Sequence, residues 1–104
     1  MTSVFKALAD PTRRKILQLL KAGPMNAGEL AEQFGVSKPT MSAHFAVLRE
    51  AGLIGSEKDG KHVTYWLNAT VLEEALLAFA GALDLNMKPG RAEAPAGEPD
   101  ARTS

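Results

Sequence analysis

Apolar residues recur at intervals of three and four along much of the chain up to residue 83. Such spacing places them on one side of an α-helix, where they can pack against a core. Ile16, Leu17 and Leu20, for example, share one face of a helix that would begin at Pro11. The pattern predicts five helices, over residues 3–9, 11–22, 27–34, 38–51 and from about 69 to 83.

Residues with known preferences for helix ends mark these segments. Asp10, Asn26 and Ser37 each precede a predicted helix and suit the N-cap position, where a side chain accepts hydrogen bonds from free backbone N–H groups. A glutamate three residues after Asn26 completes a variant of the capping box. Gly35 and Gly52 are predicted to end the third and fourth helices as C′ glycines.

After Gly52 the spacing of apolar residues changes from helical to alternating. The runs 53–58 and 61–67 flank Asp59-Gly60. An Asp-Gly pair between two alternating runs is a strong signal for a β-hairpin with a two-residue turn. A two-stranded hairpin with Asp59 and Gly60 in its turn is therefore predicted.

The order of these elements predicts the fold. The third and fourth helices are joined by a short Gly-Val-Ser connection, which fits a helix-turn-helix unit whose second helix enters the major groove of DNA. The hairpin that follows fits a wing. The predicted fold is mainly α, of the α+β class: a winged helix-turn-helix with five helices and a two-stranded β-hairpin wing. Residues 1–86 would form this domain, for DNA binding and dimerisation, and residues 87–104 a disordered tail rich in Pro, Gly, Ala and charge.

Composition narrows the function classes. The chain has 104 residues and no cysteine, which excludes disulfides, thiolate metal sites and thiol redox sensing. Its formal net charge is zero, but residues 1–68 hold nine basic and six acidic residues, whereas residues 69–104 hold three basic and six acidic ones. The body is therefore mildly basic, as DNA binding requires. No constellation of nucleophile, base or metal ligands predicts an enzyme.

The outer face of the fourth helix suits DNA. Its N-terminal half is built from small and polar residues, which allow close approach and hydrogen bonding to base edges. The free N–H groups at the start of the helix favour phosphate. The candidate DNA contacts are Ser37, Lys38, Pro39, Thr40, Ser42, Ala43 and His44 in this helix, and Lys58, Gly60 and Lys61 in the wing.

Some of these residues have a second interpretation. Lysines are mostly solvated surface charges, so their position alone is weak evidence. His44 is adjacent to the inward-facing Phe45, so a half-buried, hydrogen-bonded histidine competes with a DNA contact. For residues 13–15, Arg-Arg-Lys, a solvated helix face is favoured over phosphate contact.

Three segments carry a resemblance to a known family. Residues 4–17 (VFKALADPTRRKIL), residues 36–54 (VSKPTMSAHFAVLREAGLI) and the hairpin 59–67 (DGKHVTYWL) resemble ArsR-type winged helix-turn-helix transcriptional regulators. The resemblance spans roughly residues 3–83, and its three motifs occur in the family's order. The cysteine-free, SdpR-like branch is the most similar.

The resemblance implies a homodimer that represses transcription from operator DNA. It implies residues 37–47 as the reading helix, residues 58–62 as a wing that contacts the DNA backbone or minor groove, and a dimer joined through the first and last helices. The wide apolar stripe of the last helix independently favours a dimer, because soluble monomers avoid large exposed apolar patches. The candidate interface residues are Val4, Phe5, Leu8, Leu72, Ala75, Leu76, Phe79 and Leu83.

The chain also departs from the family. Many relatives sense metals through cysteines, or through His and Asp on the last helix, and residues 69–83 hold neither His nor Asp. No metal site or cofactor is therefore expected, and an unidentified protein or small-molecule inducer remains open. No apolar run is long enough for membrane insertion, so a cytoplasmic location is expected. The rival hypothesis is a winged-helix adaptor that binds protein and not DNA.

Overall fold

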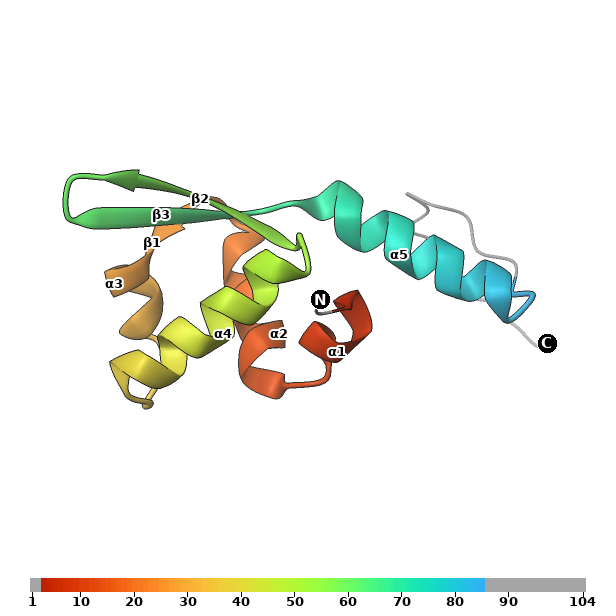
Figure 1. The fold of residues 1–104 in the computed structure, drawn as a ribbon, viewed down its shortest axis with the longest axis horizontal. Coiled ribbons are helices and arrows are strands. Elements are labelled where there is room, and N and C mark those ends of the chain that lie inside the picture. The colour runs from red at the N-terminus through yellow and green to blue at the C-terminus, as the bar shows by residue number, and fades with distance from the viewer. Residues whose placement is uncertain (1–2, 86–104) are drawn as a thin grey trace. The chain divides into compact units, whose positions relative to one another are not determined.

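A computed structural model describes residues 3–85 of the chain (Figure 1). The chain divides into two compact units, residues 1–72 and 73–104, which are described separately. In order, the described residues form α1 (Val4–Leu8), α2 (Pro11–Leu20), β1 (Met25–Asn26), α3 (Ala27–Ala31), α4 (Lys38–Glu50), β2 (Ile54–Asp59), β3 (His62–Leu67) and α5 (Ala69–Ala82). This order confirms the predicted winged helix-turn-helix. The tail expected over residues 87–104 lies outside the described residues.

The predicted N-caps are present. Asp10 Oδ1 accepts hydrogen bonds from the backbone N–H groups of Thr12 and Arg13 at 2.7 and 3.2 Å, so α2 begins at Pro11. Asn26 Oδ1 accepts from Glu29 N at 2.7 Å, while Glu29 Oε1 accepts from Asn26 N at 2.9 Å. This reciprocal pair is the capping box that the sequence predicts for α3.

The wing is part of a three-stranded sheet and not an isolated two-stranded hairpin. The two-residue strand β1 pairs antiparallel with β3, which lies between β1 and β2. Met25 is opposite Tyr65, and Asn26 is opposite Thr64. Asn26 therefore ends a strand and caps a helix at once, and this fixes the start of α3 against the sheet.

Helices α2 and α3 end earlier than predicted. α2 ends at Leu20 and α3 at Ala31, because the residues that follow form tighter i→i+3 hydrogen bonds, such as Gly23 N to Leu20 O and Phe34 N to Ala31 O. The prediction that Gly35 is a C′ glycine is wrong, since its φ is not positive.

Gly52, in contrast, ends α4 as predicted. Its φ is +80°, its N–H donates to Arg49 O at 2.9 Å, and Leu53 N donates to Leu48 O at 3.0 Å. These two bonds make a Schellman motif, which satisfies carbonyls that the helix leaves free.

The hairpin turn is displaced by one residue from the prediction. Asp59 pairs with His62, so the two turn residues are Gly60 and Lys61 and not Asp59 and Gly60. Gly60 has φ +63°, whereas Lys61 has no positive φ. A glycine with positive φ at the first turn position is typical of a type II′ turn. The register of β2 and β3 is set by burial, because Ile54 and Tyr65 must both lie on the face of the sheet that packs on the core.

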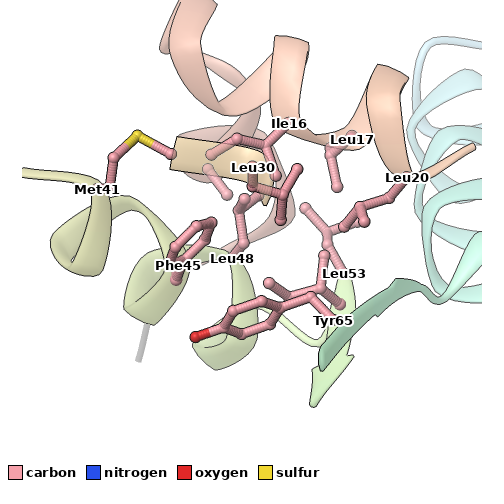
Figure 2. Close-up of a cluster of buried hydrophobic side chains, with 11 residues drawn as sticks. Ile16, Leu17, Leu20, Leu30, Met41, Phe45, Leu48, Leu53 and Tyr65 are labelled. Carbon is pink, nitrogen blue, oxygen red and sulfur yellow. The ribbon is translucent and has the colours of Figure 1, made fainter. Parts of the chain in front are cut away.

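One hydrophobic core holds the first unit together (Figure 2). The sheet and helices α1 to α4 contribute to it, and Phe45 of α4 stacks on Tyr65 of β3 with ring centroids 4.5 Å apart. The buried residues are Ala7, Ile16, Leu17, Leu20, Leu30, Met41, Phe45, Leu48, Leu53, Ile54 and Tyr65. The burial of Ile16, Leu17 and Leu20 in α2 and of Phe45 in α4 confirms the positions that were predicted to face inward.

On the other side of the sheet, Trp66 lies over a glycine of the neighbouring strand. Gly55 is opposite Trp66, and a Cβ atom added to Gly55 would lie 2.5 Å from Trp66 Nε1. The absence of a side chain at Gly55 is what allows the indole to cover the strand, an arrangement that fixes strand register.

We therefore expect Gly55→Ala to destabilise the protein by about 1–3 kcal/mol, because the indole must leave its position. The measurement is the midpoint of urea unfolding. Gly35→Ala is the control: its added Cβ meets nothing within 4 Å and its φ is ordinary, so stability should change by less than about 1 kcal/mol. Equal effects of the two substitutions would contradict the role of Gly55.

In the second unit the structure describes residues 73–85, which comprise the C-terminal part of α5 and the residues up to Leu85. Asp84 ends this helix with φ +61°, and its N–H donates to Gly81 O at 3.0 Å. Leu76, Leu83 and Leu85 are 40%, 54% and 55% exposed. No helix within residues 3–85 combines the length and apolarity needed to cross a bilayer.

Candidate nucleic-acid interface

Helix α4 is fixed from one side and open on the other. Met41, Phe45 and Leu48 are 2%, 5% and 0% exposed and attach the helix to the core (Figure 2). Most of the predicted DNA contacts in the first turns of α4 are exposed: Lys38, Pro39, Thr40, Ser42 and Ala43, together with the preceding Ser37. The structure therefore brings these residues together on one accessible surface, carried by a rigid helix.

The start of α4 is ordered by its own side chains. Ser37 Oγ accepts a hydrogen bond from Thr40 N at 3.3 Å and lies 2.9 Å from Thr40 Oγ1. These two hydroxyls are thus part of the cap, while each hydroxyl group retains capacity for a further hydrogen bond. Ser42, one turn later, forms no hydrogen bond with the described part of the chain, which leaves its hydroxyl available for an outside partner.

The wing presents lysines and acids on different sides. Side chains alternate along a strand, so Lys58 lies on the same sheet face as the buried Ile54. Glu57 and Asp59 lie on the opposite face. Lys61 occupies the turn itself, and all four side chains are exposed. Lys58 is therefore directed away from the two acids, although these four residues together have no net charge.

His44 does not lie on the open surface with the other predicted contacts. It is half-buried, and its Nδ1 lies 3.4 Å from Nη1 of Arg13. This geometry matches the hydrogen-bonded interpretation of His44. Arg13 is likewise more than a solvated residue, because its Nε donates to Ala7 O at 2.7 Å and its Nη2 to Lys6 O at 3.1 Å.

Asp10 completes this cluster. Desolvation raises the pKa of the Asp10 carboxyl. Hydrogen bonds from the backbone N–H groups of Arg13 and Thr12, together with the nearby side chains of His44 and Arg13, lower this pKa by more, so that it lies below its usual range. Asp10 is therefore ionised at neutral pH, where its charge favours the start of α2. Protonation in acid would remove that contribution.

Comparison with known proteins places this architecture in a family. Residues 8–56 match a family model described as a helix-turn-helix domain. The transcriptional repressor SdpR of Bacillus subtilis (strain 168) is 50% identical over 76 residues, which cover 73% of this chain and 84% of the relative. The solved structure of an ArsR family transcriptional regulator has a TM-score of 0.71 and 32% identity over 77% of this chain and 88% of that one. The chain belongs to the ArsR-type family of winged helix-turn-helix transcriptional regulators.

The ArsR-type regulator is a DNA-binding protein, which agrees with the interpretation of α4 and the wing and not with the protein-binding adaptor. An arsenical resistance operon repressor of Staphylococcus aureus is 36% identical over 76 residues, with 73% of each protein covered. Metal sensing does not follow from that likeness. Within residues 3–85 no three His, Asp or Glu side chains come close enough to hold a metal ion, and the chain has no cysteine.

Two hollows in the first unit of this ArsR-type regulator are smaller than typical ligand pockets. One, of about 210 Å³, lies between α3 and α4 beside Lys38, Met41 and Ser42. The other, of about 230 Å³, lies beside Leu8, Leu17 and Leu72. Small-molecule pockets usually measure about 300–1,000 Å³, so neither hollow is large enough to identify an inducer site.

Sequence reasoning missed Arg13 and Arg14 as structural residues of the regulator. Arg14 Nη1 donates to Leu8 O at 2.7 Å, so both arginines bind carbonyls at the end of α1. A local signal was present: α1 is followed within a few residues by two arginines, and cations favour helix C-termini. The turn at Asp10 between α1 and α2 determines how these arginine side chains reach α1. The helical periodicity of the sequence gives no information on the geometry of that turn.

Proposed function

We propose that this regulator represses transcription as a homodimer, with α4 of each protomer in the major groove of operator DNA and each wing against the flanking backbone or minor groove. The observation that carries the proposal is the exposed surface of small and polar residues at the start of α4, on a helix whose other side is fixed in the core. Ser42, Thr40 and Ala43 would meet base edges, and Lys38 would meet phosphate.

The dimer is proposed to form through α1 and α5. Leu76 of α5 and Leu83, which directly follows this helix, are large, apolar and exposed, and the same segment of a second copy would cover them. The other proposed interface residues are Val4, Phe5, Leu8, Leu72, Ala75 and Phe79. Val4, Leu8 and Leu72 also pack against the core of their own protomer, so they would contribute only their outer sides.

The proposal includes the setting of this activity. A protein that reads genomic DNA acts in the compartment that holds the DNA, so we expect this regulator in the cytoplasm. The proposed activity needs no catalytic step, metal or cofactor. Repression would be relieved by a partner protein, by a small molecule, or by dilution of the dimer.

A mobility-shift titration with the promoter region of the regulator's own gene, at two salt concentrations, tests the proposal. We expect a discrete complex whose affinity falls steeply with salt, because lysines that bind phosphate release counterions. A protein-binding adaptor would give no discrete complex at either salt concentration, and that outcome would contradict the proposed function.

The two parts of the interface should respond differently to substitution. Ser42→Ala should cost about 1–3 kcal/mol of binding free energy on the preferred sequence and little on unrelated DNA, because it removes a base contact.

Replacement of Lys58 and Lys61 by alanine should weaken binding to all sequences and reduce the salt slope by about two. Lys15 and Lys21 of the α2 region, both exposed, give a control of equal charge. If their replacement has the same effect, the wing makes no specific contact.

A further inference from the structure

The guanidinium of Arg13 joins three helices. It belongs to α2, its Nε and Nη2 donate to Ala7 O and Lys6 O near the end of α1, and its Nη1 lies 3.4 Å from His44 Nδ1 on α4. The two bonds to α1 are 2.7 and 3.1 Å long. Arginine can bridge three acceptors in this way because its donors form a rigid planar fork.

The contact indicates which ring nitrogen of His44 acts as the hydrogen-bond acceptor. Arginine only donates hydrogen bonds, so Nδ1 must accept from Nη1. A neutral His44 therefore has its proton on Nε2. The imidazole is thereby held from its Nδ1 side by a group outside the reading helix.

The position of His44 on α4 allows this contact to limit rotation of the helix. His44 is half-buried and lies between the exposed Ala43 and the buried Phe45, at the border between the core and the proposed DNA surface. The packing of Met41, Phe45 and Leu48 fixes one side of α4. The directional contact of His44 at the edge of the helix adds a second restraint against rotation about the helix axis. A small rotation would move Ser42 and Ala43 away from base edges.

We propose that Arg13 is a positioning residue for DNA recognition, which fixes the rotation of α4 through His44 and links that rotation to α1. The role rests on the proposed function, because α4 is the proposed reading helix and α1 a proposed dimer helix. It requires no contact between Arg13 and DNA.

The test uses the full chain and operator DNA. His44→Phe keeps a ring but removes the acceptor, whereas His44→Asn places an Oδ1 acceptor at the same distance from Cβ as Nδ1. Arg13→Lys keeps the charge and loses the fork. We expect His44→Phe and Arg13→Lys each to lower operator affinity about tenfold, with His44→Asn within about threefold of the wild type. Arg14→Ala, which removes a bond to α1 but none to α4, is the matched control and should leave affinity within about threefold.

The double variant Arg13→Lys/His44→Phe separates this role from others. We expect it to bind no more weakly than Arg13→Lys alone, since both substitutions break the contact between Arg13 and His44. Unfolding midpoints and sedimentation of each variant show whether the fold and the dimer persist. An affinity loss caused by unfolding would be accompanied by a lower midpoint, whereas a loss caused by rotation of α4 would not. Additive losses, or equal losses for His44→Asn and His44→Phe, would mean that His44 contacts DNA by itself and would overturn the proposal. Wild-type binding that no variant alters would overturn the positioning role alone, whereas a wild type that binds no DNA would overturn the proposed function as well.

Discussion

Replacement of Leu76 and Leu83 by aspartate should convert the regulator to a monomer and lower its affinity for a two-half-site operator by about a hundredfold or more. The two leucines are 40% and 54% exposed; Leu76 lies in α5, and Leu83 directly follows the helix. Burial of a leucine contributes about 1.5–3 kcal/mol, and burial of an unpaired carboxylate costs more than that gain. Loss of the dimer also removes the advantage of binding two half-sites together.

Sedimentation equilibrium at micromolar concentration measures the first effect, and mobility shifts on full and half operators measure the second. The affinity for a single half-site should change little, because α4 and its core belong to residues 1–72. Ala78→Asp is the control: Ala78 is exposed and lies about half a turn around the helix from Leu76. A wild-type protein that sediments only at 11.1 kDa would contradict the dimer.

Leu48→Ala should have the largest effect on folding, with a loss of about 2–5 kcal/mol in the free energy of unfolding. Leu48 is completely buried, and its carbonyl accepts from Leu53 N in the motif that ends α4 and leads into β2. Truncation therefore leaves a cavity where the reading helix meets the sheet. A domain of this size has only about 5–15 kcal/mol of stability in total.

Urea unfolding measures this loss, and DNA affinity should fall at temperatures where a fraction of the chains is unfolded. Arg49→Ala, at the next position, is the control: Arg49 is exposed, and its loss should cost less than about 1 kcal/mol, the usual range for a cation in the last turn of a helix. A loss below about 1 kcal/mol for Leu48→Ala would mean that the core beneath α4 closes over the cavity.

The two predictions separate two requirements for DNA recognition. The core beneath α4 presents one reading surface, and the dimer brings two such surfaces to one operator. Arg13 connects these requirements in the proposed mechanism, because its guanidinium binds both α1 and the histidine at the edge of α4.

Features that depend on neighbours in the sequence were determined by the sequence itself. The caps at Asp10, Asn26 and Ser37 act over two or three residues, and the apolar faces of α2 and α4 follow from helical periodicity. Gly52 at the end of α4 and Gly60 in the hairpin turn both have a positive φ, which glycine adopts without steric cost. The predicted fold class and reading surface rest on these local features, and the resemblance to a family rests on their order.

Features that depend on contacts between distant residues were decided only by the tertiary structure. Strand β1 has two residues, too few for an alternating pattern, and it exists because β3 offers Tyr65 and Thr64 about forty positions later. The hairpin turn moved to Gly60 and Lys61 because the core fixed the register of the strands, whereas the Asp-Gly pair indicated only that a turn was near. The partners of Arg13 lie on two other helices, and His44 is 31 positions away from it. Local propensities do not encode contacts over such a sequence separation. Helices α1 and α4 must first pack against α2, because only then can the Arg13 guanidinium reach its partners on them.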